Sequence, residues 1–423
     1  MSFETISVIG LGYIGLPTAA MFAAYGKNVI GVDVSQHAVD TINRGEIHIV
    51  EPELDAIVQK AVNEGKLKAV LEPEPADAFL IAVPTPFKGE NHEPDLSYIE
   101  SAANAVAKVL KKGDLVILES TSPVGATEQM ADWLVKARPD LTFPQSHDED
   151  SDIRVAHCPE RVLPGHVVRE LVQNDRVIGG ITPKCSKMAI DLYKIFVQGE
   201  CVITNARTAE MAKLTENASR DVSIAFANEL SVICDKLDIN VWALISLANR
   251  HPRVNILQPG PGVGGHCIAV DPWFIVSKTP EQAQLIHAAR KVNDSKPDWV
   301  LDKVKSALAE FLTSNPGKTV KEVTIACLGL AFKPDIDDLR ESPALSITCS
   351  IVDFHRGRVL VVEPNVFELP QVLKESVELT NFDYALSEAD IVVVLVDHKE
   401  FKNQIFPPAS GKCLIDTKGI WSK

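Results

Sequence analysis

The chain has 423 residues, of which 46% are hydrophobic and 23% charged, a composition typical of a soluble protein with two or three globular domains. Its 57 acidic residues outnumber 42 Lys and Arg and give a net charge of −15, which disfavours binding to nucleic acids or anionic membranes. The apolar runs are too short to cross a bilayer and the first residues form no signal pattern, so we expect a cytoplasmic protein. Eight cysteines stand singly, without C-x-x-C spacing, which predicts reduced thiols and no metal site.

The chain opens with a glycine-rich turn between an apolar strand and an apolar helix. Residues 6–9 form the predicted strand and residues 16–25 the predicted helix, and Gly10, Gly12 and Gly15 between them match G-x-G-x-x-G. In this context Gly10 allows the turn, Gly12 lets a pyrophosphate approach the backbone, and Gly15 lets the helix pack closely on the strand. The pattern predicts a dinucleotide-binding βαβ unit, and a tight turn that binds nothing is the alternative.

Further cofactor candidates lie around this turn and at strand ends. The backbone amides of Tyr13 and Ile14, at the helix start, would face the phosphates. A second predicted strand over residues 28–32 runs into Asp33, whose carboxylate suits a ribose hydroxyl and would repel a 2′-phosphate, so NAD is favoured over NADP. Three threonines follow two further predicted strands and are cofactor candidates, with neutral capping as the alternative: Thr85, Thr121 and Thr127.

The order of strands returns in the last third of the chain. Predicted strands beginning at residues 323, 359, 391 and 413 repeat the order of those beginning at residues 6, 28, 78 and 115. Four strands in matching order indicate a second copy of the unit. The predicted fold class is therefore α/β, with two Rossmann-like doubly wound parallel-sheet domains.

The second copy has lost the glycine fingerprint and carries cations and an aromatic ring instead. Phe332, Lys333 and Arg340 follow its first strand, ahead of a helix that Ser342 would cap, and Lys418 follows its last strand. An aromatic side chain and cations at strand ends suit a nucleotide base and a phosphate. Ordinary surface charge is the alternative for Lys333 and Lys418.

Between the two copies, residues 200–251 contain neither Gly nor Pro. Apolar residues from Met211 to Leu237 step by three and four, the period of a helix that buries one face. We expect a long helix here that joins the two Rossmann-like units and two subunits of a homodimer. The predicted domains are residues 1–205, 206–312 and 313–423.

A cysteine ends the most glycine-rich segment. Gly260, Gly262, Gly264 and Gly265 precede Cys267, and Asp271 follows it by four residues. Glycines at this density indicate that something approaches the backbone closely. We interpret the segment as a substrate loop that delivers a nucleophilic Cys267, and a buried core cysteine after a flexible turn is the alternative.

Two more polar groups are candidates for chemistry. Lys213 and Asn217 share one face of the long helix, with Arg220 one turn further on. An ammonium beside an amide could hold a developing oxyanion, although a solvated helix face is the alternative. Glu160 follows another predicted strand and offers a carboxylate, for which an ion pair with Arg161 is the alternative.

Five motifs in this order resemble the nucleotide-sugar 6-dehydrogenases, typified by UDP-glucose 6-dehydrogenase. The motifs are the glycine loop, Pro159-Glu160-Arg161, Glu210 with Lys213 and Asn217, Gly264-Gly265-x-Cys267 with Asp271, and Gly329-x-Ala331-Phe332-Lys333. They span nearly the whole chain. The resemblance implies an NAD-binding Rossmann domain, a helical dimerising middle domain and a C-terminal UDP-binding Rossmann-like domain.

Three details resemble one bacterial branch of this family. They are Gly-Gly-His266-Cys in place of Gly-Gly-Ser-Cys, the segment Asn249-Arg250-His251-Pro252-Arg253-Val254-Asn255, and Val162-Leu163-Pro164-Gly165. That branch oxidises UDP-N-acetyl-D-mannosamine at C6 to the uronate for surface polysaccharides such as enterobacterial common antigen. UDP-N-acetylglucosamine and UDP-glucose stay open as substrates, and His266 could equally be a core histidine.

The resemblance implies a four-electron oxidation that uses two NAD. Cys267 would carry a thiohemiacetal and then a thioester, while Lys213 and Asn217 stabilise the alkoxide-like oxygen. Asp271 would position or deprotonate a water, and Glu160 with Thr121 would serve thioester hydrolysis. The implied substrate contacts are Arg161, Val162, Lys213, Asn217, Arg220, His251, Arg253, Gly264, Phe332 and Lys333, with Lys418 as an additional contact and Arg340 toward the cofactor.

His251 or Arg253 could serve the site of a neighbouring subunit, because these residues leave the long helix where a partner could lie. Two other hypotheses about the activity fit the same residues. In one hypothesis Cys267 is inert and the enzyme stops at the aldehyde after a two-electron oxidation. In the other, the chain is a non-catalytic scaffold that senses NAD and nucleotides.

Overall fold

The computed structural model describes residues 3–49, 51–89, 92–162, 165–265, 267–366, 368–404 and 411–421. Leu163, Pro164 and His266, which belong to the motifs above, lie outside these ranges. The chain forms two compact units. The first comprises Met1–Glu216 and Trp273–Pro280, and the second comprises Asn217–Pro272 and Glu281–Lys423.

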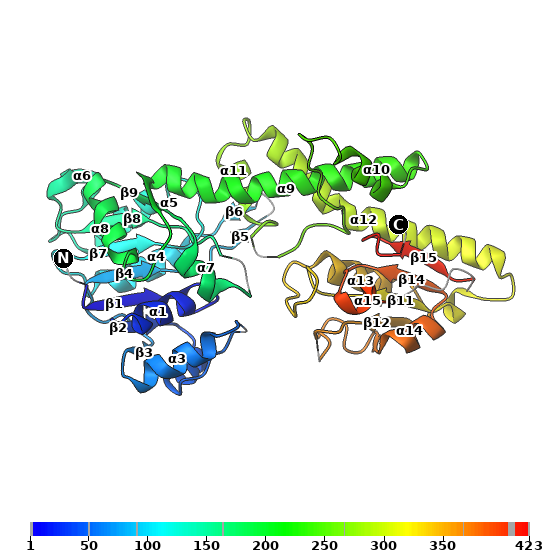
Figure 1. The fold of residues 1–423 in the computed structure, drawn as a ribbon, viewed down its shortest axis with the longest axis horizontal. Coiled ribbons are helices and arrows are strands. Elements are labelled where there is room, and N and C mark those ends of the chain that lie inside the picture. Colours follow the sequence, from blue (N-terminus) through cyan, green and yellow to red (C-terminus); the bar gives the residue numbers. More distant parts are fainter. Residues whose placement is uncertain are drawn as a thin grey trace. The chain divides into compact units, whose positions relative to one another are not determined.

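An eight-stranded sheet forms the centre of the first unit, in the order β10-β9-β8-β7-β4-β1-β2-β3 (Figure 1). Its strands are β1 (Thr5–Ile9), β2 (Asn28–Val32), β3 (Leu67–Val70), β4 (Ala78–Ile81), β7 (Leu115–Leu118), β8 (Arg154–His157), β9 (Arg176–Gly180) and β10 (Cys201–Asn205). All neighbours pair in parallel except β8 and β9. The predicted α/β fold with a parallel sheet is confirmed, and the antiparallel reversal at β9 is an addition to it.

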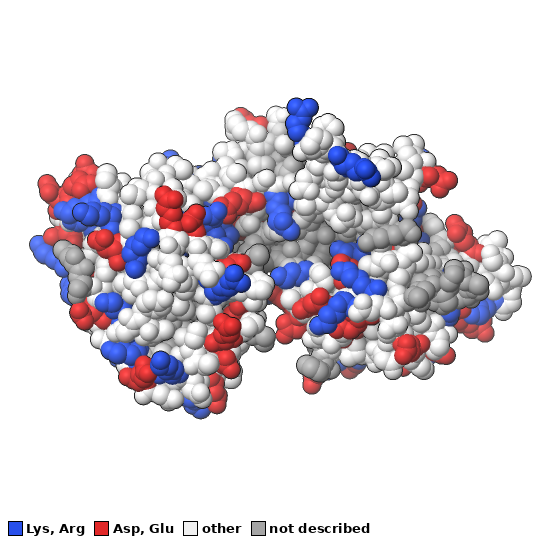
Figure 2. All heavy atoms as spheres, in the orientation of Figure 1, with Lys and Arg blue, Asp and Glu red and all other residues white. Residues whose placement is uncertain are grey.

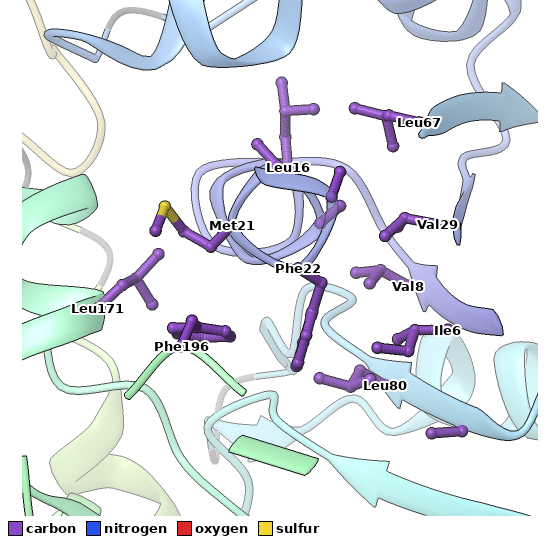
Figure 3. Packing of buried hydrophobic residues seen from close by; sticks show 14 of the residues in the cluster. Ile6, Val8, Leu16, Met21, Phe22, Val29, Leu67, Leu80, Leu171 and Phe196 are labelled. Atoms are coloured by element: carbon purple, nitrogen blue, oxygen red, sulfur yellow. The ribbon is translucent and has the colours of Figure 1, made fainter. Parts of the chain in front are cut away.

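Helices cover both faces of this sheet. They are α1 (Gly15–Ala24), α2 (Gln36–Asn43), α3 (Leu54–Asn63), α4 (Ser97–Ala107), α5 (Ala126–Ala137), α6 (Pro144–His147), α7 (Val167–Gln173) and α8 (Pro183–Tyr193), with a hairpin of β5 (Phe87–Lys88) and β6 (Glu93–Pro94). Along β1 Val8 enters one apolar core and Ile9 the other, and along β4 Leu80 and Ile81 do the same. Figure 3 shows α1 end on, with Phe22 pointing into the first core. Burial on both faces is why these strands appear in the sequence as continuous apolar runs.

A five-stranded parallel sheet forms the centre of the second unit, in the order β13-β12-β11-β14-β15. Its strands are β11 (Ile325–Leu328), β12 (Val359–Val362), β13 (Glu378–Leu379), β14 (Ile391–Val394) and β15 (Cys413–Asp416). Its helices are α13 (Pro343–Phe354), α14 (Phe382–Glu388) and α15 (Lys399–Lys402). The second Rossmann-like sheet is therefore confirmed, and Ser342 caps α13 as expected by accepting the N–H of Leu345.

The predicted long helix is confirmed in its middle and wrong at both ends. Helix α9 spans Ala206–Lys236, whereas residues 201–205 form the edge strand β10 because they pair with β9. Asp238 adopts a left-handed conformation with φ 55°, which ends the helical path, and Asn240 caps the separate helix α10 (Val241–Ala248). Helix α11 (Asp271–Lys278) follows the glycine-rich segment.

A second long helix, α12 (Gln284–Ser314), packs against α9 through buried polar pairs. Arg290 binds Asp221 at 2.7 Å, and the amide of Asn228 donates to Asn293 at 2.9 Å. Because these side chains are buried, each needs its partner. The pairs therefore fix the register of the two helices within the second unit.

Within the described residues, the helices are too short or too polar to cross a membrane. Acidic and basic side chains are interspersed over the face that Figure 2 shows. On that face, neither sign of charge is gathered into one patch of described residues.

Candidate active site

The glycine loop after β1 has the geometry that a dinucleotide requires. Gly10 has φ 90°, and a Cβ on Gly15 would lie 1.7 Å from the carbonyl oxygen of Gly10, so neither position tolerates a side chain. Gly12 has no atom within 4 Å of the place where a Cβ would stand. Tyr13 and Ile14 follow it at the start of α1, which leaves open space above the helix N-terminus for a phosphate.

Asp33 lies beside this loop, at the carboxyl end of β2. Its Oδ2 accepts the N–H of Leu11 and its Oδ1 accepts the N–H of Ser35, both at 2.9 Å. The carboxylate is half-buried, so acceptor capacity remains for ribose hydroxyls. Thr85 follows β4 and is buried, and its hydroxyl has no hydrogen-bond partner among the described residues. These observations fit a bound NAD.

The hydroxyl of Thr127 has another role in this structure. It donates to Oε1 of Glu210 at 2.6 Å, and the same carboxylate accepts the N–H groups of Gly125 and Thr127 at 2.7 and 2.8 Å. Glu210 lies on α9, so it caps α5 from a helix far along the chain. Thr127, proposed from sequence as a cofactor contact, therefore has its hydroxyl engaged by Glu210.

Glu160 forms an ion pair, but not the one considered from sequence. Its Oε2 lies 2.6 Å from a guanidinium nitrogen of Arg176, and both side chains are buried. Arg161 instead pairs with Glu216 at 2.7 Å, and only its backbone N–H donates to Glu160. The alternative of a Glu160–Arg161 ion pair is therefore wrong, because the antiparallel strand β9 brings Arg176 to the carboxyl end of β8.

A second buried carboxylate, Glu119, faces the same arginine. Its Oε1 accepts the hydroxyl of Tyr193 at 3.0 Å and lies 3.5 Å from Arg176. Burial raises the pKa of Glu119 to about 7; the positive charge of Arg176 opposes this shift and the negative charge of Glu160 adds to it. Burial also raises the pKa of the neighbouring thiol of Cys158 to about 12, so that cysteine is a neutral packing group.

The glycine-rich segment before Cys267 packs closely against its own unit. A Cβ on Gly264 would lie 2.3 Å from the carbonyl oxygen of Glu341, and one on Gly265 would lie 2.8 Å from the ring of Phe332. The N–H of Gly265 donates to the carbonyl of Arg340 at 3.1 Å. The sequence suggested a close approach by substrate, whereas here the close neighbours of these glycines are chain atoms.

Cys267 lies in a turn that leads into α11. Its carbonyl accepts the N–H of Val270 at 3.1 Å and of Asp271 at 2.8 Å, and its residue is exposed. Asp271 is buried, and its Oδ2 accepts the side-chain amide of Asn217 at 2.5 Å. The structure thus brings three of the predicted catalytic residues into one local arrangement. Lys213 lies one turn before Asn217 on the same helix.

The predicted nucleotide contacts of the second unit lie at the carboxyl edge of its sheet. The ammonium of Lys333 lies 5.7 Å from the ring centroid of Phe332, after β11. Arg340 pairs with Asp338 at 2.7 Å in the same loop. Lys418, after β15, pairs with Asp397 at 3.1 Å. Its ammonium would lie 3.4 Å from a Cβ on Gly260, so it borders the glycine-rich segment.

The other predicted contacts are more dispersed. Val162 packs partly buried against the first core, and Thr121 is half-buried after β7. Arg220 is exposed on α9, and His251 and Arg253 are exposed after α10, where the ring of His251 accepts the N–H of Arg253 at 3.3 Å. Sequence reasoning missed Glu119, Arg176 and Tyr193 altogether. Only the position of Glu119 at a strand end offered a signal.

Comparison with known proteins establishes the family. Models of the UDP-glucose/GDP-mannose dehydrogenase family match the NAD-binding domain over residues 4–197, the central domain over residues 207–295 and the UDP-binding domain over residues 326–423. The chain belongs to this family, and it is an NAD-dependent nucleotide-sugar dehydrogenase.

Several relatives are similar along their whole length. A UDP-N-acetyl-D-mannosamine dehydrogenase of Yersinia pestis is 68% identical, with 100% of each chain covered. An NDP-N-acetyl-D-galactosaminuronic acid dehydrogenase of Ralstonia nicotianae is 65% identical, over 100% of this chain and 97% of the relative. A solved UDP-D-ManNAc dehydrogenase from Pyrococcus horikoshii has a TM-score of 0.85 at 39% identity, covering 98% of this chain and 96% of its own.

Proposed function

We propose that the protein oxidises C6 of UDP-N-acetyl-D-mannosamine to the carboxylate, consuming two NAD and one water per sugar. The alcohol, two NAD⁺ and water give the carboxylate, two NADH and three protons. NAD, when bound, accepts a hydride in each of the two oxidations. The arrangement of Cys267, Asp271 and Asn217 carries the proposal, because the exposed residue Cys267 lies one turn before Asp271, whose carboxylate accepts the side-chain amide of Asn217.

The chain's own residues would divide the chemistry between them. Asn217 and Lys213 stabilise the oxygen that becomes alkoxide-like, and Lys213 exchanges its proton. The thiolate of Cys267 adds to the aldehyde carbon, which creates a thiohemiacetal whose loss of hydride leaves a thioester. Asp271 orients water, while Glu160 and Thr121 serve the hydrolysis that releases the carboxylate and regenerates the thiol.

The remaining predicted contacts would bind the two nucleotides. The glycine loop, Asp33 and Thr85 bind NAD. The proposed substrate contacts are Arg161, Val162, Arg220, His251, Arg253, Gly264, Phe332, Lys333 and Lys418. Arg340 is proposed as a nucleotide contact in the second unit. Thr127 is proposed as a cofactor contact of the first unit, where Glu210 accepts both its hydroxyl and its backbone N–H.

The sugar is the part of the proposal that rests most on relatives. Proteins named for mannosamine and for galactosaminuronic acid derivatives are 68% and 65% identical to this chain. A single differently placed group changes transition-state binding by only about 1–3 kcal/mol. The mannosamine nucleotide should therefore be compared directly with UDP-N-acetylglucosamine, UDP-glucose and the N-acetylgalactosamine nucleotide, and should show the highest kcat/KM.

The covalent mechanism is tested by counting NADH under exhaustive turnover. We expect two NADH per sugar nucleotide and a uronic acid product, and no uronate from a Cys267→Ser variant. Cys201→Ser is the matched control, because Cys201 is a half-buried thiol on the edge strand β10. One NADH per sugar would favour the aldehyde-forming alternative, and no NADH with any UDP-sugar would favour the scaffold.

We further propose a cytoplasmic homodimer. The described residues include all eight cysteines, and all are free thiols, which suits a reducing compartment. Sedimentation of the full chain should give twice the monomer mass. A role in surface polysaccharide synthesis is proposed from the mannosamine relatives alone.

A further inference from the structure

Four buried side chains of the first unit form a connected cluster at the carboxyl edge of its sheet. Arg176 is the hub: its guanidinium lies 2.6 Å from Glu160, 3.5 Å from Glu119 and 4.5 Å from the ring centroid of Tyr193. Tyr193 completes the cluster by donating its hydroxyl to Glu119. From here on this group is called the Arg176 cluster.

The antiparallel direction of β9 creates the cluster. Glu119 and Glu160 follow the neighbouring parallel strands β7 and β8, so both lie at the carboxyl edge. Arg176 is the first residue of β9, and because β9 runs opposite to β8 its first residue lies at that same edge. A parallel β9 would have placed Arg176 at the amino edge, away from both carboxylates.

The charges in the cluster are unbalanced. Two carboxylates face one guanidinium, and one oxygen of Glu119, Oε2, is buried without a hydrogen-bond partner among the described residues. A buried charge without a partner is costly. The groups that face Glu119 are Arg176, Glu160, Tyr193 and the thiol of Cys158, and only the first is a cation.

We propose that Arg176 is a positioning residue that holds the carboxylate of Glu160 for thioester hydrolysis, and that Glu119 controls this hold by competing for the same guanidinium. The proposal rests on the function proposed above, in which Glu160 serves hydrolysis. When Glu119 is protonated, Arg176 has a single charged partner and orients Glu160 firmly. When Glu119 ionises, the guanidinium is shared and Glu160 is held less firmly.

The test separates the two halves of the reaction in the full-length enzyme. Rapid mixing with NAD and the UDP-sugar measures the first-turnover burst of NADH, and intact mass after acid quench measures the acyl-enzyme at Cys267. For Arg176→Lys we expect a normal burst, accumulated acyl-enzyme and uronate release slowed by about tenfold or more. Glu160→Gln should show the same normal burst and slowed uronate release. The double variant, with both substitutions, should release uronate little more slowly than either single variant.

Arg154→Lys is the matched control. Arg154 is also a buried arginine of this sheet, but its side chain donates to backbone carbonyls and the hydroxyl of Ser151 rather than to a carboxylate. Its burst and its uronate release should both be unchanged. If Arg176→Lys folds, binds NAD normally and releases uronate at the wild-type rate, or slows both phases equally, the positioning role is wrong.

Glu119→Gln tests the competition even if the arginine variant does not fold. The glutamine cannot ionise, so in this variant Arg176 is not shared at any pH. In the wild type Glu119 ionises as the pH rises, so the ratio of the wild-type hydrolysis rate to the variant rate should fall from about pH 6 to about pH 8. The burst should keep the same pH profile in both. A ratio that is constant with pH would overturn the competition. A wild-type enzyme that forms no acyl-enzyme would instead overturn the proposed function, whatever these variants do.

Discussion

The acid that follows the second strand has opposite uses in the two Rossmann-like sheets. After β2, Asp33 is half-buried and receives one backbone N–H on each oxygen. After β12, Glu363 is buried and accepts the N–H groups of Leu330 and Ala331 and, at 3.1 Å, the ring nitrogen of His398. The first acid keeps capacity for a ribose, whereas the second is used within the fold. Matching topology therefore does not imply matching ligand contacts.

The glycine loop offers the largest expected effect. Gly15→Ala should destabilise the first unit by about 3 kcal/mol or more, because its Cβ would overlap the carbonyl oxygen of Gly10. Gly12→Ala is the matched variant, and we expect a folded protein with about tenfold weaker NAD binding, since the methyl group enters space left for a phosphate. Thermal unfolding with and without NAD measures both effects. A stable Gly15→Ala enzyme would contradict the packing described here.

The two acids can be compared directly by truncation. Glu363→Ala should lower the free energy of unfolding by about 2–4 kcal/mol, because three buried donors lose their acceptor, and should leave the Kd for NAD unchanged in the folded protein. Asp33→Ala should weaken NAD binding by about 10–100-fold with a stability loss under about 1 kcal/mol. Denaturant unfolding measures the stability of both variants, and NAD titration measures their Kd. An equal loss of stability in the two variants would contradict the different uses assigned to the two acids.

The two sheets should also respond oppositely to pH. The raised pKa of Glu119, about 7 against 4.5, means that the folded state keeps a proton which the unfolded chain has lost. The free energy of unfolding therefore falls as the pH rises from about 4.5 to about 7, by roughly 1 kcal/mol per pH unit at most. Glu119→Gln should flatten this fall.

The pKa of Glu363 is shifted in the opposite direction from that of Glu119, so its effect on stability has the opposite pH dependence. Burial opposes ionisation, but the His398 hydrogen bond and two backbone N–H groups still hold the pKa of Glu363 below its ordinary value. Its contribution is present above the unfolded pKa of about 4.5 and is lost as the pH falls through the folded pKa. Unfolding free energies measured across the pH range should show Glu363→Gln lacking this acid loss, and identical profiles for the two variants would contradict the assignment.

The smallest expected effect concerns Arg340, which forms an exposed ion pair with Asp338. Arg340→Ala should change stability by less than about 0.5 kcal/mol, because surface ion pairs contribute little. If Arg340 binds the UDP moiety, the KM for the sugar nucleotide should rise by about 5–10-fold while the KM for NAD stays constant. The reverse pattern in steady-state kinetics would assign it to NAD.

Sequence reasoning predicted the central strands well and the edges poorly. Strand β2 begins and ends at the predicted residues and β7 begins at the predicted residue, because burial on both faces leaves an unbroken apolar run. Strand β10 lies inside the segment predicted as helix and was missed. Its residues are half-buried or exposed, so no apolar pattern marked it, and only pairing with β9 makes it a strand.

The candidate site divides in the same way. The Gly10–Gly15 loop and the Cys267–Asp271 segment are local in sequence, and their spacing alone led to the predictions of a dinucleotide-binding turn and a nucleophilic Cys267. The bond between Asn217 and Asp271 joins residues 54 apart, and the ion pair between Glu160 and Arg176 depends on the direction of one strand. Such contacts leave no periodic signal.

The amino-acid sequence by itself determined the two βαβ repeats, the long helix, the family and the residue types available for catalysis, because local spacing and strand order are written along the chain. Tertiary structure alone decided which charges meet. In the folded chain Glu160 pairs with Arg176 rather than Arg161, and Glu119 is buried beside this pair. Glu363 bonds to His398. The physical reason is that the pKa and the partners of a buried charge depend on the atoms that enclose it, and folding gathers those atoms from distant parts of the chain.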